Sequence, residues 1–120
     1  SNICTSEALV GLMATVYMAT LGKQGLRQVA ELCYQKAHYA ASLIEKISGY
    51  SLPIQGTFFQ EFVVQCPRPP SEVNAGLLDQ GIVGGMDVSD SLPNGLLLCV
   101  TEMNSRREID SLAKALAELV

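Results

Sequence analysis

Charged residues are scarce in this chain, and a long run without any of them lies near its start. Asp, Glu, Lys and Arg make up 17% of the 120 residues, against about 25% in ordinary globular domains. No charged residue lies between Glu7 and Lys23. This run is shorter than the roughly 20 apolar residues that a membrane-spanning helix needs. Because a helix that is apolar on all sides is normally buried, we expect other protein to cover it, and no membrane contact.

Metal-binding side chains are also rare. Tryptophan is absent, His38 is the only histidine, and the cysteines at positions 4, 33, 66 and 99 form no Cys-x-x-Cys pair. A transition-metal site would therefore lack its usual ligands, and we predict none. Free, buried thiols in a reducing cytoplasm are the expected state of the cysteines. His38 is predicted to be solvated on the outer face of a helix.

The charge balance argues against nucleic acid as a partner. The formal net charge is −4, and Arg106-Arg107 is the only basic pair, whereas nucleic-acid binding needs a basic stripe. No methionine opens the chain, and no basic segment precedes an apolar one. We therefore expect a piece of a longer cytoplasmic protein without a signal peptide.

Hydrophobic spacing predicts one domain, residues 1–120, with helices at both ends. Thr5 is a candidate cap of the first helix, Gly22 is its expected end, and Ser105 to Glu108 has the pattern of a capping box. The expected helices are about 5–21, 26–47, 72–80 (capped by Ser71) and 106–119, and the expected strands are about 58–66, 82–83 and 96–101. This order predicts an α/β (α+β) fold, in which a small, mostly antiparallel sheet carries its helices on one face.

Few residues offer catalytic chemistry. Asp87 and Asp90 could begin a site for a hard cation, but too few oxygen donors lie nearby, which favours a solvated turn. Gly81–Gly85 fits no phosphate-binding pattern and is interpreted as a bend or bulge. The four lysines are expected to be solvated on helices or helix ends, at positions 23, 36, 46 and 114. We assign no catalytic, cofactor-binding or metal-binding residue.

Both ends of the chain resemble a known family. The matching stretches are Ser1–Thr5, Gly56–Phe58, Phe62–Val64, Glu72–Asn74, Gly81–Gly85, Leu98–Met103 and Glu108–Leu112. Together they resemble the glycine dehydrogenase (decarboxylating) family, the P-protein of the glycine cleavage system, and most of all subunit 1 of its two-subunit bacterial form. The likeness covers essentially the whole chain, and it is most specific at the two ends.

The resemblance implies a fold-type-I enzyme that depends on pyridoxal phosphate. By that likeness, this chain is the C-terminal small domain of subunit 1, and a large domain precedes it. The cofactor acts as electron sink when carbon dioxide leaves glycine, and the aminomethyl group passes to the lipoyl arm of the H-protein. The lysine that binds the cofactor covalently belongs to subunit 2, so no covalent cofactor is expected on this chain.

The resemblance points to Ser1, Asn2 and Thr5 as residues near the active-site cleft or a subunit interface. Helix entry and capping are their alternative role. Many fold-type-I enzymes place a carboxylate-binding arginine in the last strand region, but Val100–Met103 contains none. Two alternatives stay open: a small-molecule-sensing or protein-interaction module built on Gly81–Gly85, and the small domain of another fold-type-I enzyme such as an aminotransferase. The apolar first helix also predicts a non-native homodimer of this fragment.

Overall fold

The computed structural model describes residues 7–120. Its elements are α1 (Ala8–Ile44), β1 (Glu61–Gln65), α2 (Pro70–Asp79), β2 (Met86–Asp87), β3 (Gly95–Cys99) and α3 (Arg106–Glu118). The sequence predicted one domain, whereas the backbone contacts divide the chain into two compact units, residues up to Glu31 and residues from Leu32 onward.

The first unit is the amino-terminal part of α1. Gly22 has φ 62° and ψ −176°, which interrupts the helix where the sequence predicted its end. The next helical segment begins directly after Gly22, earlier than the predicted start at residue 26, because Lys23–Gly25 are helical. In the isolated chain seven large apolar side chains before Gly22 are 49–70% exposed, at Leu9, Val10, Leu12, Met13, Val16, Tyr17 and Met18, whereas Leu21 is less exposed. Among the described helices, none has the length and apolarity needed to cross a membrane.

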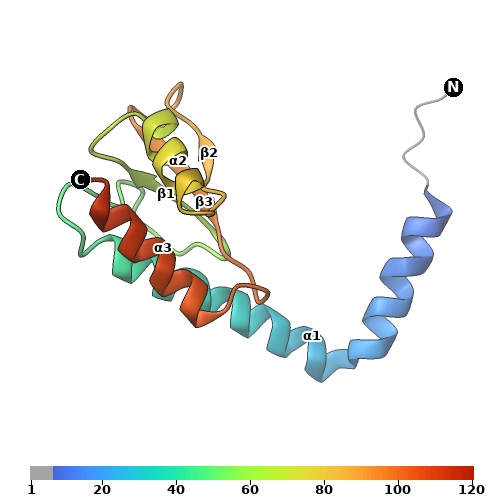
Figure 1. The fold of residues 1–120 in the computed structure, drawn as a ribbon. Coiled ribbons are helices and arrows are strands. Elements are labelled where there is room, and N and C mark those ends of the chain that lie inside the picture. The colour runs from blue at the N-terminus through green and yellow to red at the C-terminus, as the bar shows by residue number, and fades with distance from the viewer. Residues whose placement is uncertain (1–6) are drawn as a thin grey trace, which may run out of the picture. The chain divides into compact units, whose positions relative to one another are not determined.

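The second unit contains an antiparallel sheet in the order β1-β3-β2 (Figure 1). The pairing of β1 with β3 runs from Glu61 opposite Cys99 to Gln65 opposite Gly95. The strand expected at residues 82–83 is wrong, because the residues that pair with β3 are Met86 and Asp87.

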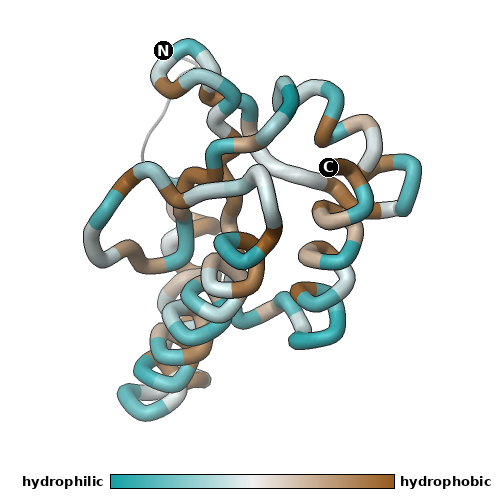
Figure 2. Tube along the Cα trace, turned by 90° about the vertical axis from the view of Figure 1, so that its left-hand side faces the viewer, coloured by the Kyte–Doolittle hydropathy of each residue, from teal (hydrophilic) through white to brown (hydrophobic). Residues whose placement is uncertain are grey.

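Helices cover one face of this sheet, as the sequence predicted. Phe62 and Val64 of β1 are buried on that face, and alternate residues point away from it. The same core holds buried residues of β3 and all three helices: Ala37, Ala40, Ala41, Ile44, Val73, Leu77, Leu96, Leu98, Ile109, Ala115 and Leu116. Hydrophobic and hydrophilic residues alternate around the helical coils (Figure 2). The opposite face, with Val63, Leu97 and Cys99, stays partly or fully exposed.

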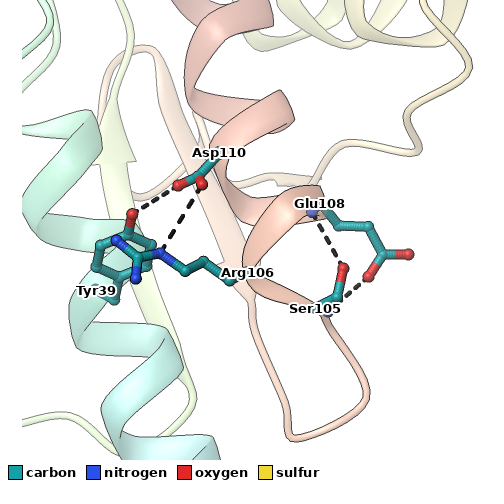
Figure 3. A network of polar contacts seen from close by, with 5 residues as sticks. All are labelled: Tyr39, Ser105, Arg106, Glu108 and Asp110. Atoms are coloured by element: carbon teal, nitrogen blue, oxygen red, sulfur yellow. Dashed lines mark hydrogen bonds and ion pairs between the residues drawn. The ribbon is translucent and has the colours of Figure 1, made fainter.

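Two helix starts differ in how they are capped. Helix α2 begins at Pro70 with no side-chain cap, so the expected cap by Ser71 is wrong; proline suits this first position because its φ is already helical and it has no N–H to satisfy. The capping box of α3 is confirmed (Figure 3). The Glu108 N–H donates to Ser105 Oγ at 3.2 Å, and the Ser105 N–H donates to Glu108 Oε2 at 2.6 Å.

Ser105→Ala is expected to lower the free energy of unfolding by about 1 kcal/mol. The substitution leaves the Glu108 N–H without its acceptor at the start of α3. Urea unfolding followed by circular dichroism measures the change. Ser111→Ala, at an exposed position inside the same helix, is the matched control and should be neutral or slightly stabilising, because alanine has the higher helix propensity. Equal losses in the two variants would contradict the capping role.

Candidate functional site

The residues that the resemblance placed near a cleft, Ser1, Asn2 and Thr5, lie outside the described residues. The described part contributes a groove of about 370 Å³ in the second unit. One wall is the Gly81–Gly84 loop, another is the end of β3, and the floor is the first half of α3.

The side chain of Asn74, on α2, fixes the glycine-rich wall. Its Nδ2 donates to the Gly85 carbonyl oxygen at 2.9 Å, and its Oδ1 accepts from the Gly85 N–H at 3.2 Å. A Cβ on Gly84 would lie 2.1 Å from Asn74 Oδ1, so a larger residue would displace the Asn74 side chain from its contacts with Gly85. The sequence predicted a bend over these glycines; the chain turns at Gly81, where φ is 74°, and the anchor of Gly85 on α2 was not foreseen.

The groove has binding groups but lacks nitrogen bases. Arg107, Glu108, Asn104 and Ser111 line it, together with apolar side chains, and neither lysine nor histidine does. The capping contact with Ser105 lowers the pKa of the Glu108 carboxyl, which keeps this carboxylate ionised and directed at the helix start. This arrangement can hold a ligand, but it offers no amine for a covalent bond to a carbonyl compound.

The loop between β3 and α3 is tied to α1 through Glu102. Lys36 Nζ donates to the Glu102 carbonyl oxygen, and Cys33 Sγ donates to Glu102 Oε2 at 3.1 Å. The prediction of a solvated lysine is therefore wrong for Lys36, because its amine reaches across to this carbonyl. Burial, followed by the contact with Glu102, raises the pKa of the Cys33 thiol.

A polar cluster joins α1 to α3 at the surface (Figure 3). Tyr39 Oη donates to Asp110 Oδ1 at 2.6 Å, and Arg106 Nε lies 4.0 Å from Asp110 Oδ2. The Arg106 guanidinium also sits 5.1 Å from the centroid of the Tyr39 ring. All three side chains engage one another, so this cluster positions α3 and leaves Arg107 as the basic side chain at the groove.

His38 and Asp87 have structural partners. His38 Nε2 lies 3.0 Å from the Phe58 carbonyl oxygen, and its ring stacks on that of Phe58 at 4.0 Å. The expectation of a solvated histidine is wrong, because Phe58 covers it. Asp87 Oδ1 accepts from the Ser89 N–H and hydroxyl, which confirms a turn. Within residues 7–120, no group of three or more candidate ligands could hold a metal ion.

The described thiols are free, and they differ in exposure. Cys33 and Cys66 are buried, as predicted, but Cys99 is exposed because it lies on the open face of the sheet. Burial raises the pKa of the Cys66 thiol to about 11, with a smaller contribution from the Asp87 carboxylate. Burial likewise raises the pKa of Tyr50 to about 12.

The free energy of unfolding should fall as pH rises from about 9 to about 11. An acid whose pKa is higher in the folded state favours folding below its unfolded pKa, and this contribution is lost as the pH approaches the folded value. Cys66→Ala should therefore show a shallower decline over this range than the unmodified chain. Urea midpoints measured across the range test this, and equal slopes in both proteins would contradict it. The remaining decline should reflect Tyr50, Cys33 and Cys99, because burial raises the pKa of each of these groups as well.

Comparison with known proteins identifies the family. Residues 1–116 match the family Glycine cleavage system P-protein. The chain is 53% identical to a probable glycine dehydrogenase (decarboxylating) subunit 1 from Thermomicrobium roseum, over 98% of this chain and 27% of that relative. A crystal structure of glycine decarboxylase (P-protein) in inhibitor-bound form matches with a TM-score of 0.92 and 32% identity, over 100% of this chain and 28% of that one.

A more distant likeness bears on the fold alone. A phosphoserine aminotransferase from Cytophaga hutchinsonii matches with a TM-score of 0.65 and 18% identity, over 87% of this chain and 29% of that one. The expected fold, a small antiparallel sheet with helices on one face, is confirmed by these structures. The chain spans about 27% of the length of the curated relatives it matches. The match across residues 1–116 and the high identity to subunit 1 sequences establish that this chain belongs to the P-protein family of the glycine cleavage system.

Proposed function

We propose that this chain is a non-catalytic supporting domain of glycine dehydrogenase (decarboxylating) subunit 1. The complete protein would act in the cytoplasm on glycine, releasing carbon dioxide and passing an aminomethyl group to the lipoyl H-protein. The observation that carries the proposal is the match over essentially the whole chain to subunit 1 sequences, with about half of the residues identical.

The proposed reaction depends on pyridoxal phosphate, which supplies an electron sink for decarboxylation. The described residues do not fit the covalent attachment of this cofactor. Lys36 is bound to the Glu102 carbonyl, and Lys114 lies 3.9 Å from Glu118 at the surface. Lys23 and Lys46 are exposed, and the groove contains no lysine. We therefore propose that subunit 2 binds the cofactor covalently and that this chain forms part of the surrounding structure.

The exposed apolar part of α1 supports a further element of this proposal. Its side chains are about half exposed or more in the isolated chain, and roughly three quarters of the length of the matched relatives lies outside this chain. We propose that the large domain of the same subunit covers this segment. In the isolated fragment the same surface would favour a homodimer, which analytical ultracentrifugation would detect.

Exchange of labelled carbon dioxide into glycine tests the proposed function. The complete protein is assayed with H-protein and pyridoxal phosphate, with and without subunit 2. Exchange that requires both subunits supports the shared enzyme. Exchange by the complete protein alone would contradict the placement of the cofactor on subunit 2. A borohydride-trapped cofactor adduct on a lysine of this chain would contradict its supporting role.

A further inference from the structure

Strand β3 presents its backbone groups alternately to its two neighbours. The Val100 N–H donates to the Gln60 carbonyl at 2.9 Å, so even-numbered residues of this strand bond toward β1. The Val88 N–H donates to the Gly95 carbonyl at 2.9 Å, so odd-numbered residues face β2. In an antiparallel sheet this alternation continues along the strand. The N–H and carbonyl of Cys99 therefore point to the side of β2.

Within residues 7–120, no strand lies opposite Cys99 on that side. The pairing with β2 ends at Met86 opposite Leu97, and the same register would place Gly84 opposite Cys99. The Asn74 amide instead holds Gly85, and the chain before it diverges from β3. The groove of about 370 Å³ opens in this gap, with Gly84 on one side and Cys99 on the other.

The walls of the groove combine apolar surface with one available cation. Ile82, Leu98 and Leu112 supply apolar contacts, and Arg107 lines the same space. Within the described residues, Arg107 has no ion-pair partner, whereas Arg106 is near Asp110 and the Glu108 carboxylate is held by Ser105. The groove therefore offers the Cys99 N–H as a donor, the Cys99 carbonyl as an acceptor, and the positive charge of Arg107, which shares the groove with the Ser105-bound carboxylate of Glu108.

We propose that this groove binds a short, extended peptide segment that carries a carboxylate side chain. The segment continues the line of β2 and pairs with the N–H and carbonyl of Cys99, as strands add to exposed sheet edges. Its carboxylate lies against Arg107. A free carboxylate satisfies only the cation, because it has no N–H for the Cys99 carbonyl. A peptide with a carboxylate side chain can bind the Cys99 N–H, the Cys99 carbonyl and the Arg107 guanidinium together.

Amide NMR of the 120-residue chain with the probe acetyl-Val-Asp-Val-amide tests the proposal. We expect saturable shifts at the Cys99 and Gly84 amides and binding about tenfold tighter than that of acetyl-Val-Lys-Val-amide. Arg107→Glu should reverse this preference. Lys46→Glu makes the same charge change at an exposed helix-end position away from the groove and should leave the preference unchanged.

A second variant isolates the backbone contact. Cys99→Pro removes the outward-facing N–H, and proline is tolerated in a strand where that group makes no ladder bond. Its binding of the Asp probe should fall about tenfold. The proposal is overturned if neither probe shifts the Cys99 amide, if both bind equally, or if acetate alone reproduces the shifts at equal affinity.

Discussion

Gly85→Ala is expected to destabilise the unit from Leu32 to Val120 by about 2 to 4 kcal/mol. A Cβ at this position would lie 2.3 Å from the Leu97 carbonyl oxygen and 2.9 Å from Leu98 Cδ2. The backbone of Leu97 cannot yield easily, because it pairs with Met86 on one side and lies opposite Val63 on the other. The chain must therefore separate β2 from β3 or break the contacts that Asn74 makes with Gly85.

Urea unfolding followed by circular dichroism measures this loss, and Gly11→Ala is its matched control. Nothing lies within 4 Å of a Cβ built at Gly11, which sits inside a helix. Alanine has the higher helix propensity, so the control should stabilise its helix by about 0.5 to 1 kcal/mol. A Gly85→Ala variant as stable as the unmodified chain would show that the approach of β2 to β3 does not require glycine.

Local chemistry explains which parts of the fold were predictable. The break at Gly22 and the capping box of Ser105 and Glu108 depend on residues adjacent in sequence, and both were predicted correctly. The buried residues of β1 also alternate with less buried ones, because side chains of a strand point to opposite sides in turn. These signals need no knowledge of distant contacts.

The incorrect predictions concern positions whose structure depends on contacts with residues distant in the sequence. Strand β2 has only two residues, and its position depends on Asn74 from another element, so Ile82 and Val83 were assigned to it wrongly. Lys36 was assigned to solvent, although the Glu102 carbonyl binds its amine. Periodicity in a single helix cannot reveal a partner 66 positions away.

The candidate site was less predictable than the fold. Three of its expected residues came from the resemblance alone and lie outside the described chain, at Ser1, Asn2 and Thr5. The groove combines Gly84, Cys99 and Arg107 from three separate segments. The glycine pair was the only local signal for it. A bend next to a sheet does not reveal which backbone groups it leaves without partners.

Leu77→Ala is the second large change, with an expected loss of about 2 to 5 kcal/mol. Leu77 is 0% exposed and belongs to the single core beneath the sheet. It also supports the groove, because its Cδ1 would lie 3.0 Å from a Cβ at Gly84 and its carbonyl accepts from the Ile82 N–H at 2.9 Å. Truncation leaves a cavity directly behind the glycine-rich wall.

Leu78→Ala on the same helix is the matched control, because Leu78 is 64% exposed and should lose less than about 0.5 kcal/mol. Urea unfolding compares the two variants, and native-state hydrogen exchange at the Gly84 and Gly85 amides reports on the wall itself. We expect faster exchange at both amides in Leu77→Ala than in Leu78→Ala, because the cavity lets the wall open locally. Equal stabilities would contradict the burial of Leu77. A loss of stability with unchanged exchange at both amides would show that Leu77 supports the core but not the groove wall.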